Sequence, residues 1–308
     1  MTATRPSPPE VICLGETMAL VAPARPMHLR HAPDFRITAA GAESNVACHL
    51  ASLGVHARWI SQLGRDPLGD RVMDELLARG VDLGSVRIVD DAPTGLYVKN
   101  PGHGVHYYRA GSAAARMGPE LLSEIDFSRV DIVHLTGITP ALSASCAELV
   151  DVAMTLARRA GTTISFDVNY RPALWADAAT AADVIARFAN RADLVFVGQD
   201  EAEVLWGAAD PGQVVAIVGQ PDTVVVKDGA LGATAVNAGE AVFEPSIPTE
   251  VVEPVGAGDA FAAGFLAALL ADRPMPERLR SGHRQASRVL STTGDLLPLP
   301  DPIDEDGA

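Results

Sequence analysis

The sequence predicts an α/β protein in which helices cover both faces of a mainly parallel β-sheet, with a small second β-sheet beside it. From about residue 131 onward, short apolar runs alternate with segments of helical periodicity, which is the rhythm of repeated strand–helix units. Between residues 19 and 113, two β-rich regions broken by proline and glycine depart from that rhythm. A chain of 308 residues is long enough to bury one large core.

The amino-terminal part begins in the main sheet and then leaves it twice. Strands are expected at residues 11–16 and 58–63, and helices that stop at glycines are expected at 45–53 and 66–79. We assign the irregular regions 19–40 and 93–113 to a small lid. An alternating pattern over 86–109, interrupted by Pro101-Gly102, predicts a hairpin.

The carboxyl-terminal part supplies the alternating units. Strands are expected at 131–135, 163–168 and 194–197, and helices at 143–160, 180–189 and 201–206. Successive units of this kind place their strands in parallel, with the helices on the two faces of the sheet. We place the folded domain at 11–297 and expect residues 298–308, which are rich in proline and acids, to be disordered.

Composition argues against several classes of protein. Hydrophobic residues make up 48% of the chain and charged residues 20%, as in a soluble globular protein. The net charge of −15 and the lack of a basic run argue against a nucleic-acid partner. No secretory signal and no apolar run of membrane-spanning length are visible, so we expect a cytoplasmic protein without a membrane partner. Cys13, Cys48 and Cys146 lack metal-ligand spacing and are expected to be buried thiols.

Residues 255–265 carry the most specific chemical signal. Gly256-Ala257-Gly258 forms a tight turn that runs into an alanine-rich helix, with Asp259 at the junction. Such a turn leaves backbone N–H groups without helical partners at the positive end of the helix dipole, and this arrangement attracts phosphate. An acid at that place is suited to take a proton from a hydroxyl that attacks the phosphate. The alternative is that Asp259 is an ordinary helix N-cap.

Three further glycine-containing segments accompany this motif. They are residues 41–47, a glycine turn entering an apolar helix, residues 64–69, and residues 224–233, which begin with a β-branched run. Together with 256–259, these segments resemble the ribokinase-like (PfkB) family of sugar kinases, and the resemblance extends from about residue 11 to 297. It implies a three-layer sandwich with a β-sheet lid, and a kinase that uses ATP and Mg²⁺.

The resemblance also implies roles for individual residues. Asp259 is the expected catalytic base, and the amides of Gly256, Ala257 and Gly258 form the expected anion hole for the transferring phosphoryl group. Nucleotide contacts are expected from Lys227, Gly229, Gly232, Gly256, Gly258 and His283. Two alternatives stay open: residues 227–233 could form a plain β-turn, and a histidine on a helix is more often a packing residue than a ligand.

The positions expected to lie near the metal match the family only in part. Glu201 matches the acidic end of an Asn-x-x-Glu motif that helps to organise magnesium through its waters, whereas Gly198 stands where the family has Asn. The alternative for Glu201 is a solvated acid at a helix start. Glu253, six residues before Asp259, stands where many relatives carry Asp near a monovalent-cation site. This departure weakens the expectation of activation by K⁺.

Segments in the middle of the chain indicate a sugar acid as the substrate. Two arginines converging on one pocket would match a carboxylate, because guanidinium groups bind carboxylates in bidentate geometry. The segments around Arg109 and Arg171 resemble those of 2-keto-3-deoxygluconate kinases, which act on the terminal hydroxyl of a sugar acid. By that resemblance, the expected substrate contacts are Gly41, Tyr97, Tyr107, Arg109, Arg171 and Asp295.

Other functions remain open on the sequence alone. A kinase for a neutral sugar such as fructose or ribose would use the same motifs, and a non-catalytic sugar sensor could share the fold. The intact turn before Asp259 argues against the sensor, which has no need of a base. Tyr107 could serve only sheet packing, and Arg171 could pair with a surface acid. Lids of this family often pair through their sheet faces, so we expect a homodimer or a larger homo-oligomer.

Overall fold

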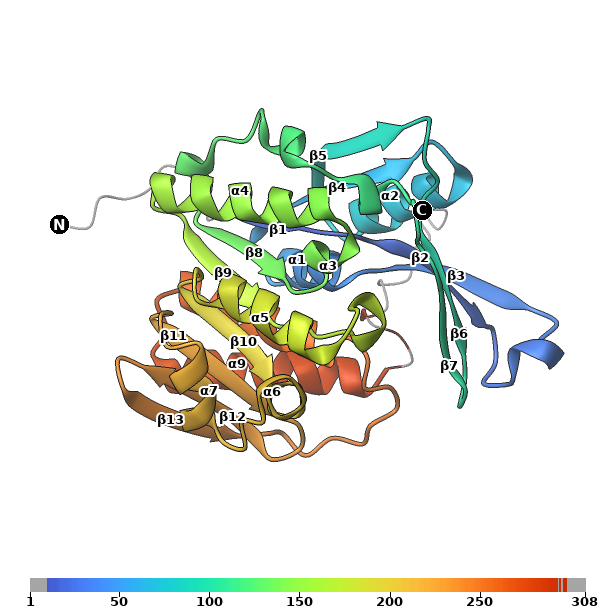
Figure 1. The fold of residues 1–308 in the computed structure, drawn as a ribbon. Coiled ribbons are helices and arrows are strands. Elements are labelled where there is room, and N and C mark those ends of the chain that lie inside the picture. Colours follow the sequence, from blue (N-terminus) through green and yellow to red (C-terminus); the bar gives the residue numbers. More distant parts are fainter. Residues whose placement is uncertain (1–9, 293, 295, 298–308) are drawn as a thin grey trace, which may run out of the picture.

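Two β-sheets form the framework of the molecule (Figure 1). The structure, a computed structural model, describes residues 10–292, 294 and 296–297. Within these residues the large sheet has nine strands in the order β13-β12-β11-β10-β9-β8-β1-β4-β5. The strands from β11 to β5 run parallel, and β12 and β13 add an antiparallel edge. The carboxyl ends of the parallel strands therefore meet at one edge of the sheet, where ligands bind in open α/β sheets.

The strands of the large sheet alternate with helices along most of the chain. In chain order these strands are β1 (Glu10–Leu14), β4 (His56–Gly64), β5 (Asp82–Val89), β8 (Ile132–Thr136), β9 (Thr163–Asp167), β10 (Leu194–Gly198), β11 (Thr223–Asp228), β12 (Gly232–Asn237) and β13 (Glu240–Pro245). The helices are α1 (Ala42–Ser52), α2 (Pro67–Ala78), α3 (Thr139–Leu142), α4 (Ala144–Ala160), α5 (Ala178–Ala189), α6 (Gln199–Trp206), α7 (Pro211–Ile217), α8 (Ala257–Leu270) and α9 (Met275–Leu290). None of the helices in the described ranges is long and apolar enough to cross a membrane.

Each face of the large sheet packs on its own layer of helices. Ile12 and Leu14 of β1 lie in a core shared with α4, α5, α6 and α7, which stand in front of the sheet in Figure 1. Val11 and Cys13 alternate with them and lie in a second core, shared with α1, α2, α8 and α9. Side chains of a strand alternate between the two faces, so a strand covered on both sides is apolar throughout. The result is a three-layer sandwich.

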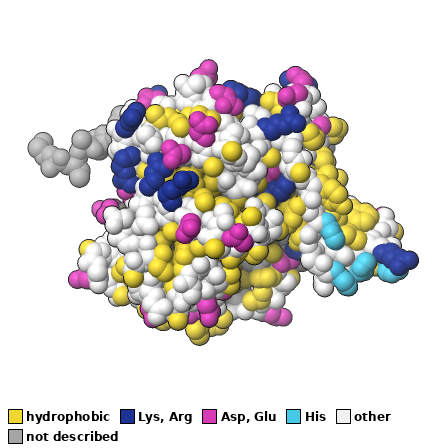
Figure 2. All heavy atoms as spheres, viewed as in Figure 1, with side chains coloured by type: hydrophobic (Ala, Val, Ile, Leu, Met, Phe, Trp, Pro, Cys, Tyr) yellow, Lys and Arg dark blue, Asp and Glu magenta, His cyan; other side chains and the backbone are white. Residues whose placement is uncertain are grey.

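The small sheet projects beside the carboxyl edge of the large one (Figure 1). Its order is β3-β2-β6-β7, with β2 (Met18–Pro23), β3 (Phe35–Ala40), β6 (Leu96–Asn100) and β7 (Gly104–Tyr108). Strands β2 and β6 pair in parallel, and the outer pairs are antiparallel. Histidines gather at the free end of this sheet (Figure 2), where the His28 ring lies 4.6 Å from that of His103 and 6.0 Å from that of His31. These contacts join the β2–β3 connection to the β6–β7 turn.

The predicted fold class is confirmed, with one strand assigned differently. The alternating pattern over 86–109 belongs to two sheets: its first residues lie in β5 at the edge of the large sheet, and only β6 and β7 form the hairpin around Pro101-Gly102. Both regions are partly exposed, so both show the alternation of a half-buried strand. The predicted tail at 298–308 lies outside the described residues.

Helices α8 and α9 pack closely because a glycine lies at their contact. A Cβ atom on Gly264 would lie 2.5 Å from the carbonyl oxygen of Ser281, closer than such atoms approach. We expect Gly264→Ala to lower the free energy of unfolding by about 1–3 kcal/mol, because the helices would have to separate. Gly212→Ala is the control: this exposed glycine in α7 has only the tip of Asp210 nearby. Urea unfolding measures both, and equal effects would contradict the role of close packing.

Candidate active site

A tight turn starts helix α8 near the carboxyl edge of the sheet. Gly256 has a φ of 83°, a left-handed conformation that favours glycine, and the helix begins directly after it. The first intrahelical hydrogen bond runs from the amide of Ala260 to the carbonyl of Gly256, at 2.9 Å. The amides of residues 257–259 precede that bond, so they lie outside the helical pattern at the positive end of the dipole. The structure has the turn-to-helix geometry expected of an anion hole.

The Asp259 carboxylate is held from two other elements. Nδ2 of Asn45, in α1, donates to Oδ2 at 2.8 Å, and Nδ2 of Asn169, just after β9, lies 3.4 Å from Oδ1. Asn169 adopts a φ of 42°, which turns the chain at the end of β9. Burial raises the pKa of Asp259 to about 7; the Asn45 hydrogen bond opposes this, Asp167 adds to it, and the charges of Arg171 and Lys227 oppose it. A carboxyl group with such a pKa can accept a proton near neutral pH.

Lys227 connects two strand ends beside the anion hole. Its Nζ donates to Oδ2 of Asp167 at 2.8 Å, and a Cβ on Gly258 would lie 3.4 Å from the same ammonium group. Burial lowers the pKa of Lys227, but the carboxylates of Asp167 and Glu201 outweigh it and raise the pKa overall. A positive charge is thus fixed next to the amides of the predicted anion hole. The expected contact of Lys227 with the nucleotide stays a prediction.

Glu201 binds backbone amides at the start of α6. Its Oε2 accepts from the amide of Gly198 at 2.8 Å, and its Oε1 accepts from the amide of Tyr170 at 2.7 Å. Burial and the nearby Asp167 raise its pKa. Among the described residues, no three His, Cys, Asp or Glu side chains come together as ligands for a metal ion. Oδ1 of Asp167 is nevertheless a buried carboxylate oxygen without a hydrogen-bond partner in the described part of the chain.

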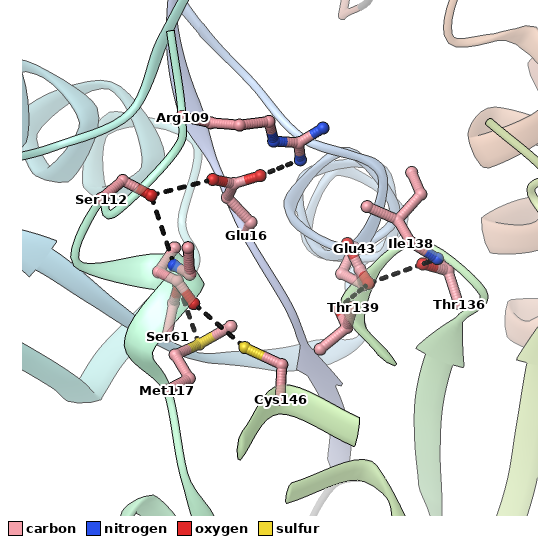
Figure 3. A network of polar contacts seen from close by, with 12 residues as sticks. Glu16, Glu43, Ser61, Arg109, Ser112, Met117, Thr136, Ile138, Thr139 and Cys146 are labelled. Carbon is pink, nitrogen blue, oxygen red and sulfur yellow. Dashed lines mark hydrogen bonds and ion pairs between the residues drawn. The ribbon is translucent and has the colours of Figure 1, made fainter. Parts of the chain in front are cut away.

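The predicted substrate residues of the small sheet lie together. The rings of Tyr97 and Tyr107 are 5.6 Å apart, and the guanidinium carbon of Arg109 lies 5.3 Å from the centre of the Tyr107 ring. Arg109 also forms an ion pair with the buried side chain of Glu16, which follows β1 (Figure 3). Gly41 borders the same place, since a Cβ there would lie 2.2 Å from the Glu16 carbonyl oxygen.

Arg171 provides the second positive charge. It is exposed after β9, where its Nη1 donates to the carbonyl of Tyr170 at 3.1 Å. Burial, and to a smaller extent the charge of Arg171, together lower the pKa of Arg109 to about 10. Arg171 also acts on the pKa of Asp259. The two arginines therefore share one region of the structure with the carboxylate expected to be the base.

The remaining predicted residues have contacts outside this cluster or lie outside the described residues. Gly229, with a φ of 45°, turns the β11–β12 hairpin, and Gly232 packs against β13, where a Cβ would lie 2.4 Å from the Glu244 carbonyl oxygen. His283 is buried in α9; its Nε2 lies 3.1 Å from that same carbonyl and its ring lies edge-on to Phe261. These contacts give His283 a packing role, and its nucleotide contact stays a prediction. Asp295 lies outside the described residues.

Sequence reasoning assigned no role to four residues that the structure places in the site: Glu16, Asn45, Asp167 and Asn169. Asn45 lies in segment 41–47, which resembles the family, and Asp167 and Asn169 lie at the end of a predicted strand. Their positions in the sequence therefore indicated that they could lie at the site. The partner of each residue is distant in sequence, and local patterns do not specify such pairings. A further ion pair, between Lys99 of β6 and Glu253, joins the small sheet to the segment before the anion hole.

Comparisons with known proteins agree with this geometry. Residues 8–302 match the model of the pfkB family carbohydrate kinases. The chain belongs to this family. It is 36% identical over 301 residues to a 2-dehydro-3-deoxygluconokinase of Bacillus subtilis (strain 168), covering 94% of this chain and 92% of the relative. A 2-dehydro-3-deoxygalactonokinase of Haloferax volcanii is 35% identical, with 96% and 95% covered. The crystal structure of a PfkB protein from Polaromonas sp. JS666 has a TM-score of 0.85 at 36% identity, covering 92% and 96% of the two chains.

The environment of Asp259 predicts the pH dependence of this carbohydrate kinase. Since only the ionised carboxylate accepts a proton, kcat/KM should rise with pH and level off above an inflection at about 7. Asn45→Ala removes a donor that favours the ionised form, so the inflection should move to higher pH. Rate measurements from pH 5 to 9, at saturating ATP, test both statements.

Two variants serve as controls for the pH profile. Asn190→Ala removes a distant amide that bonds to the carbonyls of Ala186 and Ile217, and it should leave the inflection in place. Asp259→Asn should lower kcat about a thousandfold at every pH while leaving sugar binding largely intact. An Asn45→Ala profile with an unmoved inflection would show that this amide does not tune the base.

Proposed function

We propose that this protein transfers the γ-phosphoryl group of ATP to the terminal hydroxyl of 2-keto-3-deoxygluconate, giving 2-keto-3-deoxy-6-phosphogluconate and ADP. The observation that carries the proposal is the position of Arg171. It follows β9, where its Nη1 donates to the Tyr170 carbonyl at 3.1 Å, and its charge acts both on Arg109, beside Tyr97 and Tyr107, and on Asp259. A substrate with a carboxylate at one end and a reactive hydroxyl at the other suits this pair of functions. The substrates in the names of the two relatives are sugar acids of this kind.

The chemical step needs one base and one anion site. The terminal hydroxyl oxygen attacks the γ-phosphorus, its proton passes to the Asp259 carboxylate, and the bond from the γ-phosphorus to the bridging oxygen breaks to release ADP. Asn45 and Asn169 hold the carboxylate in place during this transfer. The amides of the expected anion hole, Gly256, Ala257 and Gly258, stabilise the charge that spreads over the phosphoryl oxygens. Positioning and charge stabilisation thus carry the reaction.

The residues of the site suit a magnesium ion that arrives with the nucleotide. Oδ1 of Asp167 is a carboxylate oxygen without a hydrogen-bond partner in the described chain, and magnesium prefers such oxygen ligands. Glu201 lies nearby, since its charge and that of Asp167 both raise the pKa of Lys227. Magnesium supplies charge neutralisation on the phosphates when it is bound. Both oxygens of Glu201 already accept backbone amides, so Asp167 is the stronger candidate for a metal ligand.

A substrate panel tests the proposed function. We expect ADP release with 2-keto-3-deoxygluconate or its galactonate epimer, and rates with fructose and ribose lower by about a thousandfold or more, because a neutral sugar would leave the arginines unpaired. A coupled assay with ATP and magnesium measures all four. Comparable turnover of fructose would keep the kinase and its base, and would overturn the carboxylate role of the arginines.

Arg109 should contribute to binding of the acid and not of ATP. Arg109→Ala removes a charged hydrogen-bond donor, so the KM for the sugar acid should rise about tenfold or more while the KM for ATP stays within about twofold. Arg116→Ala is the matched control, since Arg116 is an exposed arginine whose partner is Asp91. Equal effects of Arg109→Ala on both substrates would contradict carboxylate recognition.

A further inference from the structure

A buried carboxylate lies directly beside the predicted carboxylate-binding arginine. The side chain of Glu16 is only 1% exposed, and it follows β1 at the edge of the sheet where the site lies. Burying a charge is costly unless it is paired. The negative charge of Glu16 should weaken the binding of a ligand carboxylate to Arg109, so the presence of Glu16 needs a physical explanation.

The contacts of Glu16 fix the guanidinium group of Arg109 from one side. Glu16 Oε2 accepts from Nη2 of Arg109, and its Oε1 lies 3.4 Å from Oγ of Ser112 (Figure 3). The amide of Ser112 donates to the carbonyl of Arg109 at 3.0 Å, so both contacts come from one turn after β7. The carboxylate thus holds both ends of that turn.

The same contact leaves other donors of Arg109 available. Its side chain is 12% exposed, and its Nε is buried without a hydrogen-bond partner in the described part of the chain. One terminal nitrogen points away from Glu16 in Figure 3. A buried guanidinium with an unused N–H is poised for one more acceptor, since such donors are costly to leave unpaired.

Charge balance sets the kind of acceptor. The guanidinium groups of Arg109 and Arg171 lie close enough for the charge of one to act on the other, and Glu16 neutralises one of these two charges. The pocket keeps a single positive charge. One carboxylate of a ligand would complete the balance, whereas a dianion would carry an excess negative charge next to Glu16.

We propose that Glu16 is a positioning and specificity-determining residue: it orients Arg109 and restricts this pocket to ligands with one negative charge. The proposal rests on the proposed function, because it concerns the end of the candidate active site that would receive the carboxylate of the sugar acid. A residue with a merely structural role would affect stability without changing the preference between anions. The preference is therefore the quantity to measure.

Glu16→Gln removes the charge and keeps the shape and an acceptor for Arg109. The probes are propionate and malonate, which differ mainly by one carboxylate, and their dissociation constants follow from the ligand dependence of thermal unfolding. We expect the ratio of malonate to propionate affinity to rise about tenfold in Glu16→Gln. With the sugar acid, kcat/KM should fall while the KM for ATP stays unchanged. Free magnesium is held constant in the kinetic assays, because malonate binds it.

Glu10→Gln is the matched control. Glu10 lies at the opposite end of β1 and pairs with Arg58 at 3.0 Å, so this variant removes a paired charge, 15% exposed, away from the site. Its anion ratio should equal that of the wild type. Glu16→Asp keeps the charge with a shorter side chain, so it should keep the wild-type anion ratio and raise the KM for the sugar acid. If Glu16→Gln does not fold, the Glu16→Asp variant carries the test.

The outcomes separate this proposal from the proposed function. An unchanged malonate-to-propionate ratio in Glu16→Gln overturns the specificity role, as does a shift towards malonate in Glu16→Asp. Neither measurement requires turnover. Failure of the wild type to phosphorylate 2-keto-3-deoxygluconate, together with the expected shift in the anion ratio, would overturn the proposed substrate and leave the role of Glu16 in place.

Discussion

The ion pair between Lys227 and Asp167 is the interaction on which the catalytic centre depends. It joins the carboxyl ends of β11 and β9 and places a positive charge next to Gly258. Without the ammonium group, the carboxylates of Asp167 and Glu201 would face each other and Asp259 in a poorly solvated place. Loss of one partner of a buried pair is far more costly than the net gain from the pair. The ion pair therefore fixes the ends of β9, β10 and β11 relative to one another, and the first turn of α8 packs next to them.

The two ends of the candidate active site differ in how they hold a buried charge. At the Asp259 end, neutral amides of Asn45 and Asn169 hold a carboxylate whose pKa burial has raised, which leaves it able to exchange a proton. At the Arg109 end, Glu16 supplies a full opposite charge. Neutral donors suit a group that is predicted to change its protonation state, and a charged partner suits one that is predicted to keep its charge. The difference follows from the chemistry that each end has to perform.

The sequence was sufficient for the layers of the fold and for the chemistry of single segments, because both depend on local patterns. The turn at Gly256, the helix after it and the gathering of Tyr97, Tyr107 and Arg109 were predictable from residue type and order. The pairings were not: Asn45 meets Asp259 across 214 positions, and Glu16 meets Arg109 across 93. Lys227 is another example, since its loop predicted a nucleotide contact, which stays a prediction, and gave no sign that its ammonium group bonds to Asp167, 60 positions away. Periodicity does not encode which strand ends become neighbours.

The packing of α1 on α8 also has a consequence for the protein during its synthesis, because the two helices are made at different times. A ribosome adds about 5–20 residues per second, so about ten to forty seconds separate the synthesis of Asn45 from that of Asp259. During that interval the growing chain has the first strands of the sheet but no base and no phosphate site. Unfinished chains therefore lack the residues of the predicted anion hole and base, and the face of α1 that packs on α8 stays uncovered. The two halves of the candidate active site come together only when the last part of the polypeptide has been made.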